Sequence, residues 1–231
     1  NYPAFPIIGG YDLMEKMEEH ADKFNVNKFP MEEIKQVDLV SNPKVIETIN
    51  YTFKAKTVII ATGAQPRKLG VNGEKEFVGR GVSYCAICDG AFYKDKIVAV
   101  VGGGNAALEE AMYLTKFAQK VYVIHRRNEF RADKIVQNLA FKNEKLEFVY
   151  DTVVDEILGE DTVKTLKITN VKTSEKSTLN VDGIFPYIGF LPNTDLINGQ
   201  VEQDSNGFII TDETMQTSIK GVFAAGDVRS E

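Results

Sequence analysis

The chain has 231 residues, of which 43% are hydrophobic and 26% charged, so it can bury one large core or two smaller ones. Its formal net charge of −6 argues against a nucleic-acid partner, because general binders of phosphate backbones need a basic face. No apolar run approaches the roughly 20 residues that cross a bilayer, and we therefore expect a cytoplasmic protein with no membrane segment.

The first quarter of the chain predicts a helix followed by a small antiparallel meander. Apolar residues recur at helical spacing between Tyr11 and Phe24. Runs rich in β-formers follow, and they predict strands at 34–40, 45–51 and 57–60. The last run ends in Ala61-Thr62-Gly63-Ala64, where small side chains let a ligand or another segment approach the backbone closely.

The middle of the chain contains the clearest unit, a strand, a glycine turn, a helix and a second strand. We place these at 97–101, 102–104, 105–117 and 121–124, which together form a βαβ unit. A helix is expected at 132–142. Further strands are expected at 147–150, 152–157, 163–171, 177–181, 183–188, 207–211 and 221–225, the last running into Gly226-Asp227.

The only two cysteines, Cys85 and Cys88, form a CxxC pair. Two sulfurs at this spacing suit a reversible disulfide whose thiolate is stabilised by nearby helix N–H groups. Zinc is the main competitor, but a structural zinc site needs about four ligands and the chain adds only His20 and His125. We therefore expect no metal. A purely structural disulfide is disfavoured in a cytosolic chain.

Asp89 follows the second cysteine directly, so its carboxyl group lies beside a sulfur that must gain or lose a proton. One interpretation makes Asp89 a general acid or base. The other makes it a cap of a helix or turn, which is common for aspartate. The sequence leaves both open.

The segment Gly102-x-Gly104-x-x-Ala107, with Asn105 and Ala106 between, matches the fingerprint of a dinucleotide-binding loop. It follows an apolar strand and opens a helix, so the pyrophosphate would meet N–H groups at the positive end of the helix dipole. No acidic residue stands directly after the next strand. Arginines stand there instead and favour NADP(H) over NAD(H), because guanidinium groups pair with a 2′-phosphate. The residues of this basic segment are His125, Arg126, Arg127 and Arg131. A solvated basic face is the alternative.

The motifs, taken in order, resemble those of the low-molecular-weight thioredoxin reductases. They are Cys85-Ala86-Ile87-Cys88-Asp89-Gly90, Gly102 to Ala107, and His125 to Arg131. Two further segments are similar to flavin-domain signatures of that family, namely Ala61-Thr62-Gly63 and Gly221 to Asp227 with its Gly226-Asp227 end. The resemblance covers essentially the whole chain.

The resemblance implies an α/β fold of two Rossmann-like lobes, with an NADPH lobe inserted into a discontinuous FAD lobe. The expected domains are 1–67 and 189–231 for the FAD lobe and 68–188 for the NADPH lobe. The family's first FAD loop and the helix after Arg229 are missing, so we expect both ends, at Asn1 and Glu231, to be incomplete.

The resemblance also implies the activity of a thioredoxin-disulfide reductase. Electrons would pass from NADPH to FAD, then to the Cys85–Cys88 disulfide, and on to thioredoxin or a similar dithiol protein. Cys88 would be the sulfur nearer the flavin and Asp89 the proton donor. Because one lobe carries both nicotinamide and cysteines, family members rotate the lobes, here at residues 64–70 and 186–192. A homodimer is expected.

Two other functions stay open at this point. The flavoprotein component of an alkyl hydroperoxide reductase system shares the same core motifs. A flavin-free, NADPH-binding redox sensor belongs to a different class. A ferredoxin-linked relative without a CxxC pair is contradicted by the two cysteines themselves.

Overall fold

A computed structural model describes residues 2–230, and the expectations that involve Asn1 and Glu231 lie outside this range. The chain forms two compact units. One comprises Asn1–Val58 with Leu196–Gln200, and the other comprises Ile59–Asp195 with Val201–Glu231. These divisions follow spatial contact, whereas the domain bounds given above follow cofactor binding and stay a prediction.

The first unit contains α1 (Gly10–Asp22) and an antiparallel sheet of β1 (Ile34–Asp38), β2 (Lys44–Thr48) and β3 (Thr52–Ala55), in that order. The expected meander is confirmed for its first two strands, but its third strand is β3, and the strand expected at 57–60 lies outside this sheet. The second strand, expected at 45–51, ends at Thr48. There the Thr48 N–H donates to Tyr51 O at 2.9 Å and closes a turn. The side chain of Gln200 bonds to the backbone of Val37 and Leu39, each at 2.8 Å.

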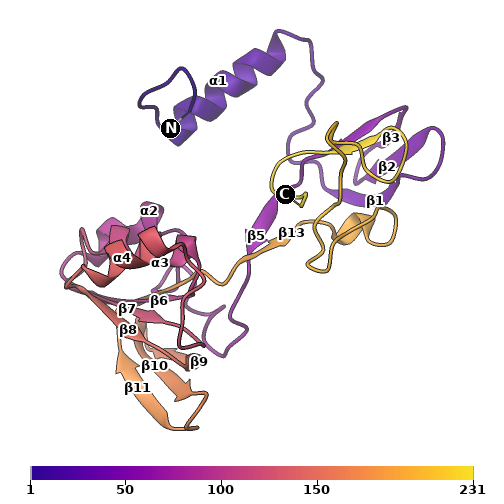
Figure 1. The fold of residues 1–231 in the computed structure, drawn as a ribbon. Helices are drawn as coiled ribbons and strands as arrows, with labels where there is room; N and C mark the ends of the chain where they lie inside the picture. Colours follow the sequence, from indigo (N-terminus) through magenta and orange to yellow (C-terminus); the bar gives the residue numbers. More distant parts are fainter. Residues whose placement is uncertain (1, 231) are drawn as a thin grey trace. The chain divides into compact units, whose positions relative to one another are not determined.

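The second unit is built around a parallel sheet in the order β12–β6–β7–β8. Figure 1 shows helices on one face of this sheet and an antiparallel sheet on the other. The central strands are β6 (Ile97–Val101), β7 (Lys120–Ile124), β8 (Leu146–Val149) and β12 (Gly183–Pro186). The helices are α2 (Ala86–Asp89), α3 (Asn105–Leu114) and α4 (Lys134–Phe141). The second sheet is β9 (Thr152–Gly159), β10 (Val163–Asn170) and β11 (Lys176–Asn180). The expected α/β fold is confirmed.

Strand β6 explains why this layered arrangement forms. Successive side chains of a strand point to opposite faces. Val98 and Val100 enter the core under the helices, whereas Ala99 and Val101 enter the core against the antiparallel sheet. Covering both faces requires a continuous apolar run, and each fully buried valine contributes about 1.5–3 kcal/mol.

Short strands lead into and out of the layered part of the second unit, which is formed by the parallel sheet, its helices and the antiparallel sheet. β5 (Ala64–Pro66) pairs antiparallel with β13 (Phe190–Pro192), and we call this pair the linker ribbon. β4 (Val58–Ile60) pairs with β14 (Val222–Ala224). Two 3-10 helices complete the elements, η1 (Gly90–Tyr93) and η2 (Asp195–Ile197).

The prediction of a strand at 207–211 is wrong. Ile209 forms only isolated bridges to Gln203 and Arg229, because the chain here turns too tightly for a ladder. The side chain of Asp204 accepts the backbone N–H groups of Asn206 and Phe208 and holds that turn. Among residues 2–230, no helix is both long and apolar enough to cross a membrane.

Candidate active site

Cys85 and Cys88 form a disulfide across the first turn of α2, with their Cα atoms 5.3 Å apart. The Cys88 N–H donates to Cys85 Sγ at 3.1 Å, so the first sulfur caps the short helix. Cys88 is exposed and Cys85 half-buried. A second protein can therefore reach this disulfide. Within residues 2–230, no cluster of three or more His, Cys, Asp or Glu residues could hold a metal ion.

Asp89 is half-buried, and its backbone N–H donates to Cys85 O at 3.1 Å. It precedes η1, but its side chain forms no capping hydrogen bond there. The capping interpretation is thus wrong for the 3-10 helix that follows. Asp89 lines a cavity of about 320 Å³ together with Arg80, Phe92 and Lys96. The carboxyl group remains available for proton exchange beside the disulfide.

The glycine loop between β6 and α3 has the geometry that a dinucleotide needs. Gly102 has φ of 155°, and a Cβ on it would lie 2.3 Å from Tyr187 O and 2.8 Å from the Cβ of Ala107. These contacts explain the small residues at both positions. Gly104 precedes α3 without a side-chain cap, and nothing lies within 4 Å of a Cβ there. The start of the helix is thus open to a pyrophosphate.

The other predicted loop residues divide into two groups. Ala106 is exposed, as expected for a position next to the nucleotide. The Asn105 amide is already paired, since it donates to Asp133 Oδ2 at 2.8 Å and accepts from Asp133 N–H at 2.7 Å. Asn105 therefore fastens α3 to the start of α4.

Two of the three arginines reach the cavity beside the loop. Arg126 and Arg131 line a cavity of about 280 Å³ with Gly102 and Gly103, whereas Arg127 lies outside its lining. The Arg131 N–H donates to Gly103 O at 2.7 Å, so the basic segment is fixed to the loop. Salt bridges within residues 2–230 involve none of these arginines. Their charges are free for a phosphate.

His125 differs from the arginines because it is buried, with only 6% of the residue exposed. Its Nε2 lies 3.1 Å from Glu129 O, and a Cβ on Gly103 would lie 2.3 Å from the ring. Burial is the first cause that lowers the pKa of His125, and the nearby arginines lower it further. The ring lies beneath the glycine loop in its neutral form.

Arg67 is a residue that the sequence reasoning missed. It lines the same 280 Å³ cavity, although it comes from the linker and not from the βαβ unit. Its N–H donates to Gly189 O at 2.9 Å and extends the linker ribbon by one bond. A lone arginine before Lys68 resembles any charged surface residue, so no sequence signal could have found it.

The flavin-type segments lie where strands end. Thr62 Oγ1 donates to Asn193 O at 2.7 Å, and Asn193 Nδ2 donates to Thr62 O at 2.9 Å, which holds the segment Ala61–Gly63. Ala225 N–H donates to Ile60 O at 2.9 Å, so the second segment begins beside the first. Gly226 and Asp227 are exposed, and a Cβ on Gly63 or Gly226 would have nothing within 4 Å. Both segments leave open backbone that fits a dinucleotide such as FAD.

Comparison with known proteins places these features in one family. The model of the pyridine nucleotide-disulphide oxidoreductase family matches residues 5–231. A thioredoxin reductase of Peptoclostridium acidaminophilum is 47% identical over 99% of this chain and 75% of its own length. One from Listeria innocua is 45% identical over the whole chain and 72% of its own length.

Solved structures agree with these relatives. The thioredoxin reductase of Lactococcus lactis, in its FR conformation, is 43% identical and superimposes with a TM-score of 0.86, covering all of this chain and 76% of that one.

Proposed function

The chain belongs to the pyridine nucleotide-disulphide oxidoreductase family, in its thioredoxin reductase branch, and we propose that its Cys85–Cys88 disulfide passes electrons from NADPH to a thioredoxin-like protein. Its activity is that of an NADPH-dependent, FAD-containing thioredoxin-disulfide reductase, as the sequence predicted. The observation that supports the proposed role of the cysteines is the exposure of Cys88 on the unit that also carries the glycine loop.

The nucleotide-binding residues have separate roles in this proposal. Gly102 and Gly104 admit the pyrophosphate to the start of α3, and Ala106 and Ala107 keep the approach clear. Arg126 and Arg131 hold the 2′-phosphate through charge-assisted hydrogen bonds. Arg127 adds a long-range charge. His125 supports the loop from below, which suits a buried, neutral ring.

The residues that would hold FAD are Ala61, Thr62, Gly63, Gly226 and Asp227, whose backbone lies open at two strand ends. FAD, when bound, supplies two-electron transfer between NADPH and the disulfide. Asp227 is an exposed carboxylate that suits a hydroxyl group of the cofactor.

The cysteine chemistry follows from the disulfide and its neighbour. Two electrons break the S–S bond and leave two thiolates, one of which takes a proton from Asp89. The other thiolate attacks one sulfur of the partner's disulfide, forms a mixed disulfide and releases the partner's second sulfur as a thiolate. The protonated cysteine then returns its proton to Asp89 and attacks the mixed disulfide, which restores Cys85–Cys88 and releases the partner. The partner's two thiolates take one proton derived from the hydride of NADPH and one from solution, so NADPH and one proton are consumed for each disulfide reduced.

An exposed apolar surface beside the disulfide suits a protein partner. The side chains of Ile87 and Phe92 are 65% and 74% exposed, and they lie in α2 and η1 on either side of Cys88 and Asp89. Large apolar side chains in such positions favour docking of another protein. We place the contact with thioredoxin here. Cytoplasmic location and a homodimer remain part of the proposal on the family resemblance alone.

Absorbance spectroscopy tests the whole electron path. The protein supplied with FAD should be yellow, should bleach on anaerobic addition of NADPH, and should regain its colour when oxidised thioredoxin is added. A protein that bleaches with NADPH but is not reoxidised by thioredoxin would contradict the proposed partner.

A further inference from the structure

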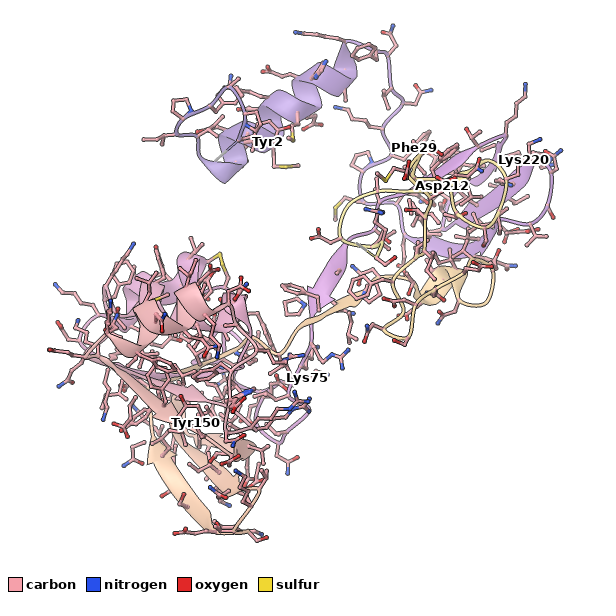
Figure 2. All side chains as sticks on the ribbon, viewed as in Figure 1. Tyr2, Phe29, Lys75, Tyr150, Asp212 and Lys220 are labelled. Atoms are coloured by element: carbon pink, nitrogen blue, oxygen red, sulfur yellow. A yellow bond between two sulfur atoms is a disulfide. The ribbon has the colours of Figure 1, made fainter. Side chains whose placement is uncertain are left out.

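The incoming linker, residues 67–70, leads from β5 into the part of the second unit that carries the glycine loop, and its far end is held by Glu74. Beyond the linker ribbon, the N–H groups of Leu69 and Gly70 donate to Glu74 Oε1 and Oε2 at 2.8 and 2.7 Å. Figure 2 shows Lys75, the next residue, where the chain enters this part of the molecule. The segment before this point, Arg67–Lys68, has no such fastening to Glu74.

Glu74 is unusual because the residue is only 3% exposed and its carboxylate forms no salt bridge within residues 2–230. Burying a carboxylate is costly unless hydrogen bonds satisfy it. A third bond does so, since Tyr84 Oη donates to Glu74 Oε1 at 2.8 Å. Burial, and then this bond, raise the pKa of Tyr84, so the hydroxyl keeps its proton and remains a donor. A charged acceptor with three donors makes a rigid junction.

Tyr84 directly precedes Cys85, and Ala86, which directly follows Cys85, is also held by a hydrogen bond. Ala86 N–H donates to the hydroxyl of Tyr187 at 2.7 Å. Tyr187 in turn donates its own N–H to Val101 O at 2.7 Å and stands just before the outgoing linker, Ile188–Gly189. Tyr84, through its hydroxyl, and Ala86, through its backbone N–H, are therefore bonded to Glu74 and Tyr187 at the roots of the two linkers.

We propose that Glu74, Tyr84 and Tyr187 are positioning residues that fix the Cys85–Cys88 disulfide relative to the two linkers. When the NADPH lobe rotates, the chain bends at Arg67–Lys68 and at Ile188–Gly189. Gly70 and Tyr187 then move with the disulfide as one rigid body. This inference rests on the proposed function, because a fixed orientation matters only where lobe motion presents the disulfide to its electron donor.

The Tyr84→Phe variant tests this junction, because it removes only the hydroxyl group that donates to Glu74. Thioredoxin reduction should show a kcat lower by about tenfold, because a hydrogen bond to a charged group is lost and fewer molecules present the disulfide correctly. NADPH-dependent reduction of ferricyanide by the holoenzyme, which does not need the cysteines, should be unchanged. Tyr113→Phe on α3 is the matched control and should leave both rates unchanged. Glu74→Gln should lower kcat at least as much as Tyr84→Phe, since its amide cannot accept from Gly70.

Amide hydrogen exchange followed by NMR gives a readout independent of activity. Tyr187→Phe should speed exchange of the Ala86 amide about tenfold, and Glu74→Gln should do the same for Gly70. An unchanged kcat in Tyr84→Phe, or ferricyanide reduction that falls in parallel, would overturn the inference. Failure of the wild-type protein to reduce thioredoxin would instead contradict the proposed function, so the two failures are distinct.

Discussion

At the scale of single residues, the cysteines separate binding from turnover. Cys85→Ser and Cys88→Ser should each abolish thioredoxin reduction, because one sulfur cannot form or regenerate the disulfide that the structure contains. NADPH affinity should be retained, since the glycine loop and its arginines stay in place. Equilibrium NADPH binding and coupled turnover measure the two properties, and full turnover in either variant would contradict the mechanism.

The arginines should discriminate between the two nicotinamide cofactors. Arg126 and Arg131 line the cavity beside the loop, and a hydrogen bond from a guanidinium to phosphate is worth about 1.5–3 kcal/mol. Replacing both with alanine should weaken NADPH binding on the order of a hundredfold and leave NADH binding nearly unchanged. Titration calorimetry with both nucleotides checks this. Arg127→Ala is the control and should lose much less affinity, whereas equal losses for NADPH and NADH would indicate a structural role.

His125 should make stability depend on pH in one direction. Its folded pKa is lowered from 6.5, so the unfolded chain binds the proton more readily than the folded one. The stability that the neutral ring contributes is therefore present above about pH 6.5 and is lost as the pH falls toward the folded pKa. Urea unfolding at about pH 7.5 and about pH 5.5 measures the loss, which should be smaller in His125→Gln. An equal loss in both proteins would assign the effect to other groups.

The sequence located the disulfide and the glycine loop, whose geometry is local, but missed residues whose partners are distant in the chain. The CxxC pair and the glycine loop are short motifs that carry their own geometry. Arg67 and Glu74 were missed, because one comes from the linker and the other stands in the charged run Glu74-Lys75-Glu76, which is typical of a solvated surface. Only the fold shows that Glu74 is buried under three donors.

At the scale of elements, two glycines of one loop should respond differently to the same change. Gly102→Ala should destabilise the fold by at least about 2 kcal/mol, since its φ of 155° and a Cβ 2.3 Å from Tyr187 O leave no room. Gly104→Ala should cost less than about 1 kcal/mol, because nothing lies within 4 Å, yet its methyl group would obstruct the pyrophosphate. Denaturant unfolding and NADPH binding separate the two effects. Similar loss of stability in both variants would contradict this account.

Elements with strong periodicity were predicted well, and short ones were not. β6, α3 and β7 form one continuous pattern of apolar strand, glycine turn and amphipathic helix, so the sequence placed them within three residues. The hairpin turn before β3 was missed because Ile49 and Tyr51 have high strand propensity although they occupy a turn. Tertiary hydrogen bonds decide such cases, and a single sequence does not contain them.

At the scale of the whole molecule, the reaction needs one surface that meets two partners in turn. The disulfide, the glycine loop and the roots of both linkers belong to the same compact unit. Their connections run through Tyr84, Tyr187 and the backbone around Cys85. In the proposed mechanism, a lobe with these internal bonds turns without distorting the disulfide and presents the exposed face around Cys88 to the electron donor and the protein substrate in turn.

The proposed contact with thioredoxin at Ile87 and Phe92 leads to a last prediction. Phe92→Ser removes a 74% exposed ring beside the disulfide, and it should raise the KM for thioredoxin about tenfold, as expected for an aromatic docking residue. The rate of NADPH-dependent ferricyanide reduction should not change, because that reaction needs no docking. Ile135→Ser on α4 is the matched control, since Ile135 is 75% exposed but lies outside α2 and η1. If Ile135→Ser raised the KM as much as Phe92→Ser, thioredoxin would not dock specifically at the disulfide.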